Sequence, residues 1–373
     1  MEFPSLKDHL IAHKKVLLRV DFNSALDANH QVTDDYRIKR TVPTIQKLLQ
    51  SGNKIIIMAH LGRPTGIDPD YSLKPVAERL QTYLPGYTVV LLNSPQDIQQ
   101  HQWQEKELLM LENLRFFPGE KKNDPEFAKE LASLGDVYVN DAFGNSHRDH
   151  ASMTGIAKLL PSYAGLLLTE EIEMIDRATK NPQHPVVVIL GGAKVSTKMG
   201  LIEKFVTIAD SILIGGAMAN TFLKATGVDI KNSLAEEEMV ETAKQLLNST
   251  EKQNRIILAD DFIWQDEKIL DVGPETQKKW EEIIQSAKTI IWNGPVGYIE
   301  DERFQARTDA VFEAIIHNDH AVSVVGGGET VSAISAKEGA DGITHISTGG
   351  GAMLEYIEKG TLPGIEALIS SQY

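Results

Sequence analysis

Val186-Val-Val-Ile-Leu190, followed at once by Gly191-Gly192-Ala193-Lys194, is the stretch that decides the fold of this chain. Five apolar residues without alternation, rich in β-branched Val and Ile, are typical of a strand buried on both faces of a parallel sheet. The glycines after it predict a tight turn, and the residues beyond the turn predict a helix. A strand, a glycine turn and a helix together indicate the α/β class.

Similar apolar runs recur along the chain, and most end in Gly, Asn, Asp or His. The runs that predict strands are Val16–Val20, Ile55–Met58, Val89–Leu92, Leu108–Leu111, Val137–Val139, Val186–Leu190, Ile212–Ile214, Ile256–Leu258, Thr289–Trp292, Ala321–Val325 and Ile343–Ile346. Amphipathic stretches between them predict helices, such as Pro75–Leu84, Glu126–Leu134 and Pro274–Ser286. At 373 residues the chain exceeds what one hydrophobic core usually supports. We expect two doubly wound, parallel-sheet (Rossmann-like) α/β domains.

Composition excludes several classes of partner and chemistry. The formal net charge of −15 disfavours nucleic acid and anionic membranes as partners, because both repel an acidic surface. The chain has no cysteine, which excludes disulfides and thiolate chemistry. No apolar run approaches membrane-spanning length, and the first fifteen residues do not resemble a secretory signal. We expect a cytoplasmic protein that binds neither nucleic acid nor membrane.

Basic side chains gather in the loops of the first half. Ligands of parallel α/β sheets bind at the carboxyl ends of the strands, where these loops lie. The arginines concerned are Arg19, Arg37, Arg63, Arg115 and Arg148. Any one of them alone is best interpreted as a solvated surface residue. Together they predict that the ligand is a small, multiply charged anion with a phosphate group. Guanidinium groups bind phosphate and carboxylate through paired donors. His60 and His147 could add donors, and Asp21 and Asn23 could orient the arginines.

Glycine-rich loops take the same positions in the second half. They are Gly191-Gly192, Gly215-Gly216, Asn293-Gly-Pro-Val-Gly297, Gly326-Gly-Gly328 and Gly349-Gly-Gly351. Backbone N–H groups at a helix N-terminus are a favourable site for phosphate, and Lys194 and Lys198 share one helix face. The alternative is a pair of surface lysines beside a tight turn. Neither the P-loop motif nor a full G-x-G-x-x-G motif is present, so these patterns indicate a nucleotide site assembled from several loops.

The change from basic to glycine-rich loops falls between about residue 150 and residue 186. That stretch contains an acidic run at Glu170, Glu171 and Glu173, and the turn-like sequence Asn181-Pro-Gln-His-Pro185. We therefore expect the domain boundary there.

These loops, in this order, closely resemble those of the phosphoglycerate kinase family over nearly the whole chain. In the first half the matching stretches are Arg19-Val-Asp-Phe-Asn23, Thr33-Asp-Asp-Tyr-Arg-Ile38, His60-Leu-Gly-Arg-Pro64, Leu111-Glu-Asn-Leu-Arg-Phe116, and Asn140-Asp-Ala-Phe-Gly144 with His147-Arg148. In the second half they are Leu190-Gly-Gly-Ala-Lys-Val-Ser196 with Lys198, Ile214-Gly-Gly216 with Met218-Ala-Asn-Thr-Phe222, Trp292-Asn-Gly-Pro-Val-Gly297 with Glu300, Gly326-Gly-Gly328, Ser347-Thr-Gly-Gly-Gly-Ala352 and Leu362-Pro-Gly-Ile365.

The resemblance implies two domains joined by a hinge. Residues 1–167 would bind 3-phosphoglycerate or 1,3-bisphosphoglycerate, residues 168–361 would bind Mg-ADP or Mg-ATP, and the tail 362–373 would pack back on the N-terminal domain. The residues at the family's phosphoglycerate positions are Asp21, Asn23, Arg37, His60, Arg63, Arg115 and Arg148. The resemblance also implies a monomer.

For the nucleotide, the resemblance places the phosphates at Gly191, Gly192, Lys194 and Lys198, with Asn293 nearby. Gly215, Gly216 and Gly297 would shape the nucleoside pocket, and Glu300 would lie near the ribose. The loop Gly326-Gly327-Gly328-Glu329-Thr330 would complete the site. Glu329 stands where the family usually has Asp, and it is the expected contact for Mg²⁺.

The reaction implied is reversible transfer of the acyl phosphate of 1,3-bisphosphoglycerate to ADP, which gives 3-phosphoglycerate and ATP. The leaving carboxylate is a weak base and the ADP oxygen is already ionised, so positioning and charge neutralisation dominate over acid–base catalysis. Arg37, Lys198 and the glycine-loop amides, with Gly327 and Gly350, would stabilise the transferring group. Two alternatives are a dehydrogenase with a Rossmann half and a non-catalytic, kinase-like binding or regulatory protein.

Overall fold

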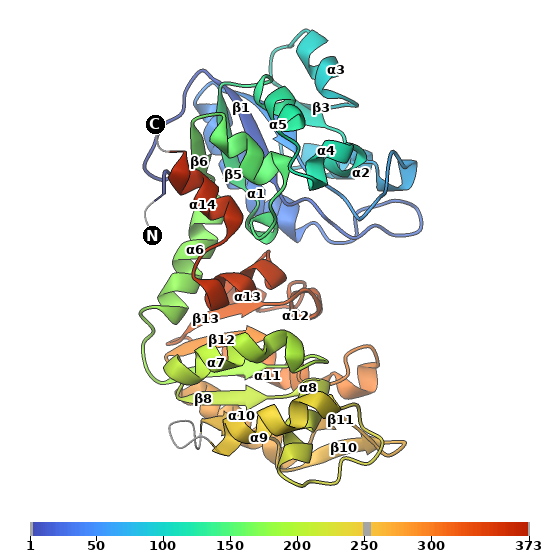
Figure 1. Cartoon of the computed structure of the whole chain (residues 1–373), viewed down its shortest axis with the longest axis vertical. Coiled ribbons are helices and arrows are strands. Elements are labelled where there is room, and N and C mark those ends of the chain that lie inside the picture. The colour runs from blue at the N-terminus through green and yellow to red at the C-terminus, as the bar shows by residue number, and fades with distance from the viewer. Residues whose placement is uncertain (1–2, 249–254, 372–373) are drawn as a thin grey trace. The chain divides into compact units, whose positions relative to one another are not determined.

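The computed structural model describes residues 3–248 and 255–371 (Figure 1). The chain divides into two compact units. The first runs to Ile172 and resumes at Lys359, and the second is Glu173–Glu358. The division falls within helix α6 (Leu166–Thr179). Over the described residues, no helix combines the length and the apolar character needed to cross a membrane.

Unit 1 is built on a six-stranded sheet in the order β3-β4-β2-β1-β5-β6, in which every pair of neighbours is parallel. Its strands are β1 (Lys15–Val20), β2 (Lys54–Met58), β3 (Thr88–Leu92), β4 (Glu107–Leu111), β5 (Val137–Asp141) and β6 (Ser162–Ala164). Its helices besides the start of α6 are α1 (Tyr36–Gln50), α2 (Lys74–Gln81), α3 (Pro95–Gln100), α4 (Pro118–Lys121), α5 (Pro125–Ala132) and α14 (Pro363–Ser370). The chain winds to one side of β1 and then to the other, so the sheet has a topological switch point between β1 and β5.

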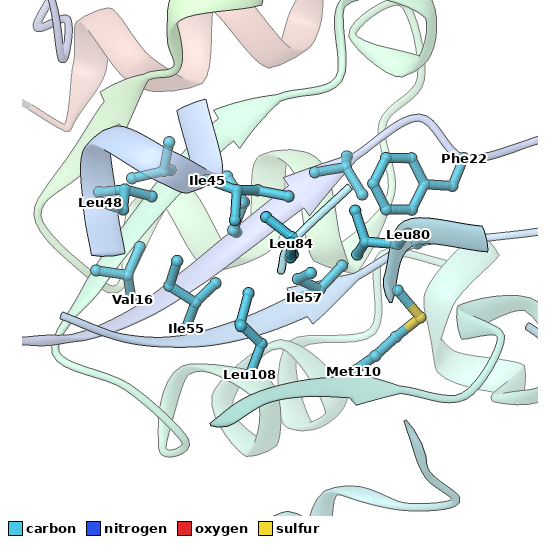
Figure 2. Packing of buried hydrophobic residues seen from close by; sticks show 14 of the residues in the cluster. Val16, Phe22, Ile45, Leu48, Ile55, Ile57, Leu80, Leu84, Leu108 and Met110 are labelled. Atoms are coloured by element: carbon cyan, nitrogen blue, oxygen red, sulfur yellow. The ribbon is translucent and has the colours of Figure 1, made fainter. Parts of the chain in front are cut away.

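Apolar side chains from the sheet and the helices fill the core of unit 1. Figure 2 shows Val16, Ile55, Ile57, Leu108 and Met110 from three neighbouring strands packed with Ile45, Leu48, Leu80, Leu84 and Phe22. All of these side chains are almost completely buried. Because β1 and β2 are covered on both faces, their sequences are continuous apolar runs rather than alternating ones.

Unit 2 is built on a second parallel sheet, in the order β14-β13-β12-β7-β8-β9. Its strands are β7 (Val186–Leu190), β8 (Ser211–Ile214), β9 (Ile256–Ile257), β12 (Thr289–Asn293), β13 (Val322–Gly326) and β14 (His345–Ile346). Its helices are α7 (Met199–Ile208), α8 (Gly216–Ala225), α9 (Val240–Asn248), α10 (Pro274–Ser286), α11 (Ala306–Ile316), α12 (Gly328–Ile334) and α13 (Gly350–Lys359). Counted within the sheet, this is the 3-2-1-4-5-6 order of a Rossmann fold, with its switch point between β7 and β12.

Short helical turns complete both units. They are η1 (Pro69–Tyr71), η2 (Leu114–Phe116), η3 (Phe143–Asn145), the π-helical η4 (Ala151–Gly155), η5 (Ile156–Lys158), η6 (Ser196–Lys198), η7 (Glu237–Met239), η8 (Glu302–Phe304) and η9 (Ala340–Gly342).

The fold class expected from the sequence is confirmed, since both units are parallel α/β sheets flanked by helices. All the apolar runs named above form strands of these two sheets. The sequence patterns missed β6 and an antiparallel hairpin, β10 (Phe262–Gln265) with β11 (Lys268–Val272). The C-terminal helix α14 packs on unit 1, where the Gly364 N–H donates to the Ser146 carbonyl at 2.8 Å. Residues 372 and 373 of the expected tail lie outside the described residues.

Candidate active site

The residues expected to bind phosphoglycerate lie at the carboxyl edge of the unit 1 sheet. Asp21 and Asn23 follow β1, His60 and Arg63 follow β2, Arg115 follows β4 and Arg148 follows β5. Arg37 lies in the first turn of α1. Parallel strands bring their carboxyl ends to one edge, so loops far apart in sequence converge at the switch point.

Arg37 joins helix α1 to the loop after β1. Its Nη1 donates to the Asn23 carbonyl at 3.0 Å, and its Nε lies 3.6 Å from Oδ2 of Asp21. Asn23 in turn accepts from the Gly62 N–H through Oδ1 at 2.8 Å. These contacts fix the loops after β1 and β2 relative to each other and hold the guanidinium of Arg37 at the edge of the sheet.

His60 lies between two arginines and is buried. Its Nδ1 is 3.3 Å from Nη2 of Arg19, and its Nε2 is 3.2 Å from Nη1 of Arg148. Burial and the charges of the surrounding arginines hold the pKa of His60 well below its usual range. The ring is therefore neutral near pH 7, and it can supply a hydrogen bond without adding charge.

Arg115 and Arg148 carry charges that this part of unit 1 does not fully balance. Burial, together with the charges of the neighbouring Arg148, Arg19 and Arg63, lowers the pKa of Arg115 to about 10. Arg115 donates from Nη1 to the Gly62 carbonyl at 2.7 Å, but its buried Nε has no partner among the described residues. Arg63 is exposed. This crowding of like charges suits a multiply charged anion, whose binding would relieve the repulsion.

Lys198 occupies the switch point of the unit 2 sheet. Its Nζ donates to the Gly191 carbonyl at 2.6 Å, to the Asn293 carbonyl at 3.1 Å and to Asn293 Oδ1 at 2.9 Å. Gly191 follows β7 and Asn293 ends β12, so the ammonium bridges the two strands between which the chain reverses. Burial lowers the pKa of Lys198 to about 8, and the charge of Glu329 partly opposes this effect.

The glycine loops of unit 2 pack backbone against backbone. A Cβ added at Gly191 would lie 1.9 Å from the Pro295 carbonyl oxygen, and one at Gly350 would lie 2.7 Å from the Cα of Gly327. Gly327 itself has φ +106°, which L side chains rarely adopt. Thr330 Oγ1 accepts from the Gly294 N–H at 2.9 Å. Gly327, Gly350 and Thr330 are therefore brought together beside Asn293, whose buried Nδ2 has no partner among the described residues.

A cavity of about 470 Å³ opens beside these loops within unit 2. Of the residues expected at the nucleotide, it is lined by Gly192, Gly216, Gly297, Glu300 and Glu329. Leu223, Phe262 and Val296 contribute apolar wall. An apolar cavity with a few polar groups is the usual form of a small-molecule site.

The other expected nucleotide residues do not line this cavity. Gly215 precedes α8, and a Cβ on it would lie 2.8 Å from Cβ of Val296. Gly326 ends β13 and Gly328 begins α12. A Cβ on Gly328 would meet no atom within 4 Å. Lys194 is exposed, and its charge helps to lower the pKa of Glu236.

Sequence reasoning missed Asp271, which lines the same cavity. Its side chain is 2% exposed, and Oδ2 has no partner among the described residues. Burial raises the pKa of Asp271 to about 7. The sequence feature that could have indicated this residue is a charged side chain inside the otherwise apolar run Ile269-Leu-Asp-Val272. Arg19 was grouped with the arginines of the first-half loops but was not among the residues expected at the phosphoglycerate, and its buried guanidinium contacts His60.

Comparison with known proteins agrees with this geometry. A family model described as phosphoglycerate kinase matches residues 6–360. The chain belongs to the phosphoglycerate kinase family. A phosphoglycerate kinase of Koribacter versatilis is 46% identical to it, and the match covers 98% of each chain. "Phosphoglycerate kinase 3, cytosolic" of Arabidopsis thaliana is 42% identical, over 98% of this chain and 97% of that protein.

Solved structures of phosphoglycerate kinases share the fold. The structure from Coxiella burnetii is 36% identical, covers 99% of both chains and superposes with a TM-score of 0.88. Membership of the phosphoglycerate kinase family makes the chain an enzyme, a phosphotransferase of glycolysis. The dehydrogenase and the non-catalytic binding protein are thereby set aside.

Proposed function

We propose that unit 1 binds 3-phosphoglycerate or 1,3-bisphosphoglycerate and that unit 2 binds Mg-ADP or Mg-ATP. The observation that carries this assignment is the different chemistry at the two switch points. The edge of the unit 1 sheet gathers arginines, while that of unit 2 offers one buried lysine, close-packed glycine loops and a cavity. The first suits a small anion with phosphate and carboxylate groups, and the second suits a nucleotide.

In unit 1, Arg63, Arg115 and Arg148 grip the phosphoglycerate, with His60 as a neutral donor. The unpaired Nε of Arg115 supports this role, because a buried N–H without a partner is costly until a ligand accepts from it. Asp21 and Asn23 hold Arg37 at the edge of the site. These contacts support our assignment of Arg37 to both substrate binding and stabilisation of the transferring phosphoryl group.

In unit 2, the apolar wall of the cavity receives the base and Glu300 lies near the ribose. Gly191, Gly192, Asn293 and Lys198 receive the phosphates. The unpaired Nδ2 of Asn293 and the ammonium of Lys198 lie at the switch point, where a phosphate oxygen would give Nδ2 an acceptor and offer Lys198 a charged one. The cavity volume is in the range of small-molecule sites, roughly 300–1,000 Å³.

Mg²⁺ enters as part of the nucleotide substrate. Mg²⁺ prefers oxygen ligands and keeps several waters, so a protein site of one or two carboxylates is enough. Glu329 fits this requirement, because its side chain lines the cavity and its charge acts on Lys198. When bound, the ion neutralises charge on the phosphate oxygens.

The residues act on the transferring phosphoryl by position and charge. Lys198 exchanges its carbonyl partners for phosphoryl oxygens, while Arg37 and the amides of Gly327 and Gly350 neutralise the charge that moves. No general base is required, because the carboxylate and the ADP oxygen are both ionised near neutral pH. The protein acts as a monomer in the cytoplasm, a location supported by the cytosolic relative.

Turnover with 3-phosphoglycerate and Mg-ATP, followed by consumption of the acyl phosphate product, tests the proposal. We expect turnover in the wild type and in Lys204→Ala, which removes an exposed lysine of α7. Absence of acyl phosphate formation by the wild type would overturn the proposal. Arg63→Ala is expected to raise the KM for phosphoglycerate more than it lowers kcat, because Arg63 grips the substrate and does not meet the transferring group.

A further inference from the structure

A buried chain of polar groups lies beneath the arginines of unit 1. It runs from Glu120 in α4 through Ser152 in η4 and Arg19 in β1 to His60 after β2. Each of these four side chains is at most 2% exposed. The function described so far uses only the last of them, so the other three need an explanation.

Glu120 and Ser152 fix Arg19 in place. The Ser152 hydroxyl donates to Glu120 Oε1 at 2.7 Å, and the Ser152 N–H donates to Oε2 at 3.0 Å. The same hydroxyl accepts from Arg19 Nε at 2.9 Å, and Arg19 Nη1 donates to the Val20 carbonyl. Burial opposes ionisation of Glu120, yet the hydrogen bonds from His150 and Ser152 and the charge of Arg19 hold its pKa below the usual range. Glu120 is therefore a buried carboxylate that balances the buried guanidinium.

His60 faces a donor on each side. Arg19 Nη2 lies 3.3 Å from Nδ1 and Arg148 Nη1 lies 3.2 Å from Nε2. A guanidinium has donors only, and a neutral imidazole has one acceptor nitrogen, so His60 can accept from one arginine but not from both. The groups that face the ring from neighbouring elements are Arg19, Arg115, Arg148 and His150, and together with burial they keep it neutral.

The contacts and burial of the two arginines indicate which of them His60 accepts from. Arg19 is held by Ser152 and Val20 in the interior, so its Nη2 cannot turn away from Nδ1. Arg148 is only partly buried, and its Nε bonds to the neighbouring His147 at 3.3 Å. This contrast favours Nδ1 as the nitrogen that accepts from Arg19, which leaves the ring proton on Nε2. Nε2–H and Arg148 Nη1 are then two donors that face the same space.

We propose that Glu120 and Ser152, acting through Arg19, are positioning residues that hold His60 as its Nε2–H tautomer. In this state His60 and Arg148 form a two-donor notch for one anionic oxygen of the phosphoglycerate. The notch rests on the proposed binding of phosphoglycerate to unit 1, but the tautomer does not. Because an anionic oxygen accepts from both donors at once, its binding removes the conflict between them.

Nitrogen NMR of the ¹⁵N-histidine-labelled full-length protein without ligand tests the tautomer. We expect the His60 signal of the wild type to report a protonated Nε2 and an accepting Nδ1. Ser152→Ala removes the hydroxyl that holds Arg19 Nε and is expected to give a mixture of tautomers. Glu120→Gln keeps an acceptor for the serine hydroxyl but removes the charge, and it is expected to act in the same direction. If Glu120→Gln does not fold, Ser152→Ala still decides the question.

The affinity for 3-phosphoglycerate tests the notch. We expect the Kd of Ser152→Ala to rise by roughly 10- to 100-fold, the effect of one charge-assisted hydrogen bond. The Kd for Mg-ATP, which is assigned to the other unit, is expected to stay unchanged and so to show that the variant is folded.

Each other outcome has a definite meaning. A wild-type His60 protonated at Nδ1 overturns the inference, and so does Ser152→Ala with unchanged His60 signals. A changed tautomer with an unchanged Kd overturns the notch. If the wild type does not bind 3-phosphoglycerate but shows the expected tautomer, the proposed function fails while the positioning of His60 stands.

Discussion

Lys198 has its three ammonium donors satisfied in the ligand-free protein by oxygens of Gly191 and Asn293. None of these acceptors carries a full charge, and burial makes the ammonium costly, which is why the pKa of Lys198 lies at about 8. A phosphate oxygen carries negative charge and is a better partner than a carbonyl. This environment therefore favours the exchange of carbonyl partners for phosphate oxygens that we propose for Lys198.

This environment predicts a pH dependence. The proposed role requires the ammonium form of Lys198, so kcat/KM for Mg-ADP is expected to fall as the pH rises through about 8, where the free enzyme loses this proton. Bound phosphate stabilises the charge, so kcat alone is expected to fall at higher pH. Lys198→Arg keeps its charge and is expected to lose this decline. Lys198→Ala is expected to lower kcat by roughly 10²–10³-fold.

The dependence of the rate on pH, measured for the wild type, Lys198→Arg and Lys198→Ala, checks the prediction. A kcat/KM of the wild type that stays constant well above pH 8 would contradict it. Retention of near-normal kcat by Lys198→Ala would contradict the role itself.

Glu329 is the second residue whose role can be measured directly. It lies in the first turn of α12 and lines the nucleotide cavity, so its carboxylate either contacts the metal-nucleotide or merely complements the helix dipole. Glutamate reaches farther than aspartate by roughly one C–C bond, about 1.5 Å. We expect the wild type to be active, with a dependence on Mg²⁺ or Mn²⁺ that differs from that of Glu329→Asp and of Glu329→Gln. Metal titrations of the three proteins measure this difference. If Glu329→Gln changes neither the metal dependence nor kcat, the helix-dipole role is correct.

At the scale of elements, local pattern was sufficient for the buried strands. The predicted strand Val186–Leu190 has the same bounds as β7. Five apolar residues covered on both faces form a clear pattern, and the glycines that follow mark its end. Ile343–Ile346 was predicted too long, since only His345 and Ile346 pair with β13. The hairpin β10–β11 was missed because its turn residues, Asp266 and Glu267, have positive φ without a glycine or asparagine to mark them.

Topology alone predicts convergence only for the site residues that follow strands, whereas Arg37, in α1, takes its expected role from the family resemblance. His60, Arg115 and Arg148 lie at strand ends, so the topology alone brings them together. Glu120 and Ser152 come from α4 and η4, which meet only in the tertiary structure, and nothing local to either residue marks a link with His60. The burial of Asp271 likewise depends on packing with Gly297, a residue from a distant loop.

The glycine loops of unit 2 predict different outcomes for two neighbouring glycines at the start of α13. A Cβ at Gly350 would lie 2.7 Å from Gly327 Cα, whereas one at Gly351 would meet nothing within 4 Å. Gly350→Ala is expected to lower the free energy of unfolding by roughly 1–3 kcal/mol, because backbone atoms must move apart. Gly351→Ala is expected to be neutral or to raise it by up to about 1 kcal/mol, since alanine favours a helix. Chemical denaturation measures both, and equal effects would contradict this account of the packing.

At the scale of the whole molecule, the net charge and the charge of the site have opposite signs. The chain carries −15 overall, yet the edge of the unit 1 sheet gathers arginines whose pKa is lowered by burial and by one another's charge. Charges farther away than about 8 Å are largely screened at physiological salt, so an anionic substrate near the edge responds mainly to the local cluster. An acidic protein can therefore bind two anionic substrates, provided that each switch point supplies its own cations.

The assignment of the two substrates to different units predicts a conformational change. The proposed transfer requires Arg37 of unit 1 and Lys198 of unit 2 to contact one phosphoryl group, and we propose that the units close around the substrates to achieve this. Closure also excludes water, which would otherwise hydrolyse the acyl phosphate. We expect solution scattering to show a smaller radius of gyration mainly when 3-phosphoglycerate and Mg-ATP are both present. Each ligand alone is the matched control, and Arg63→Ala is expected to need more 3-phosphoglycerate for the same compaction. Identical scattering from the ligand-free and the doubly bound protein would show that transfer does not use closure.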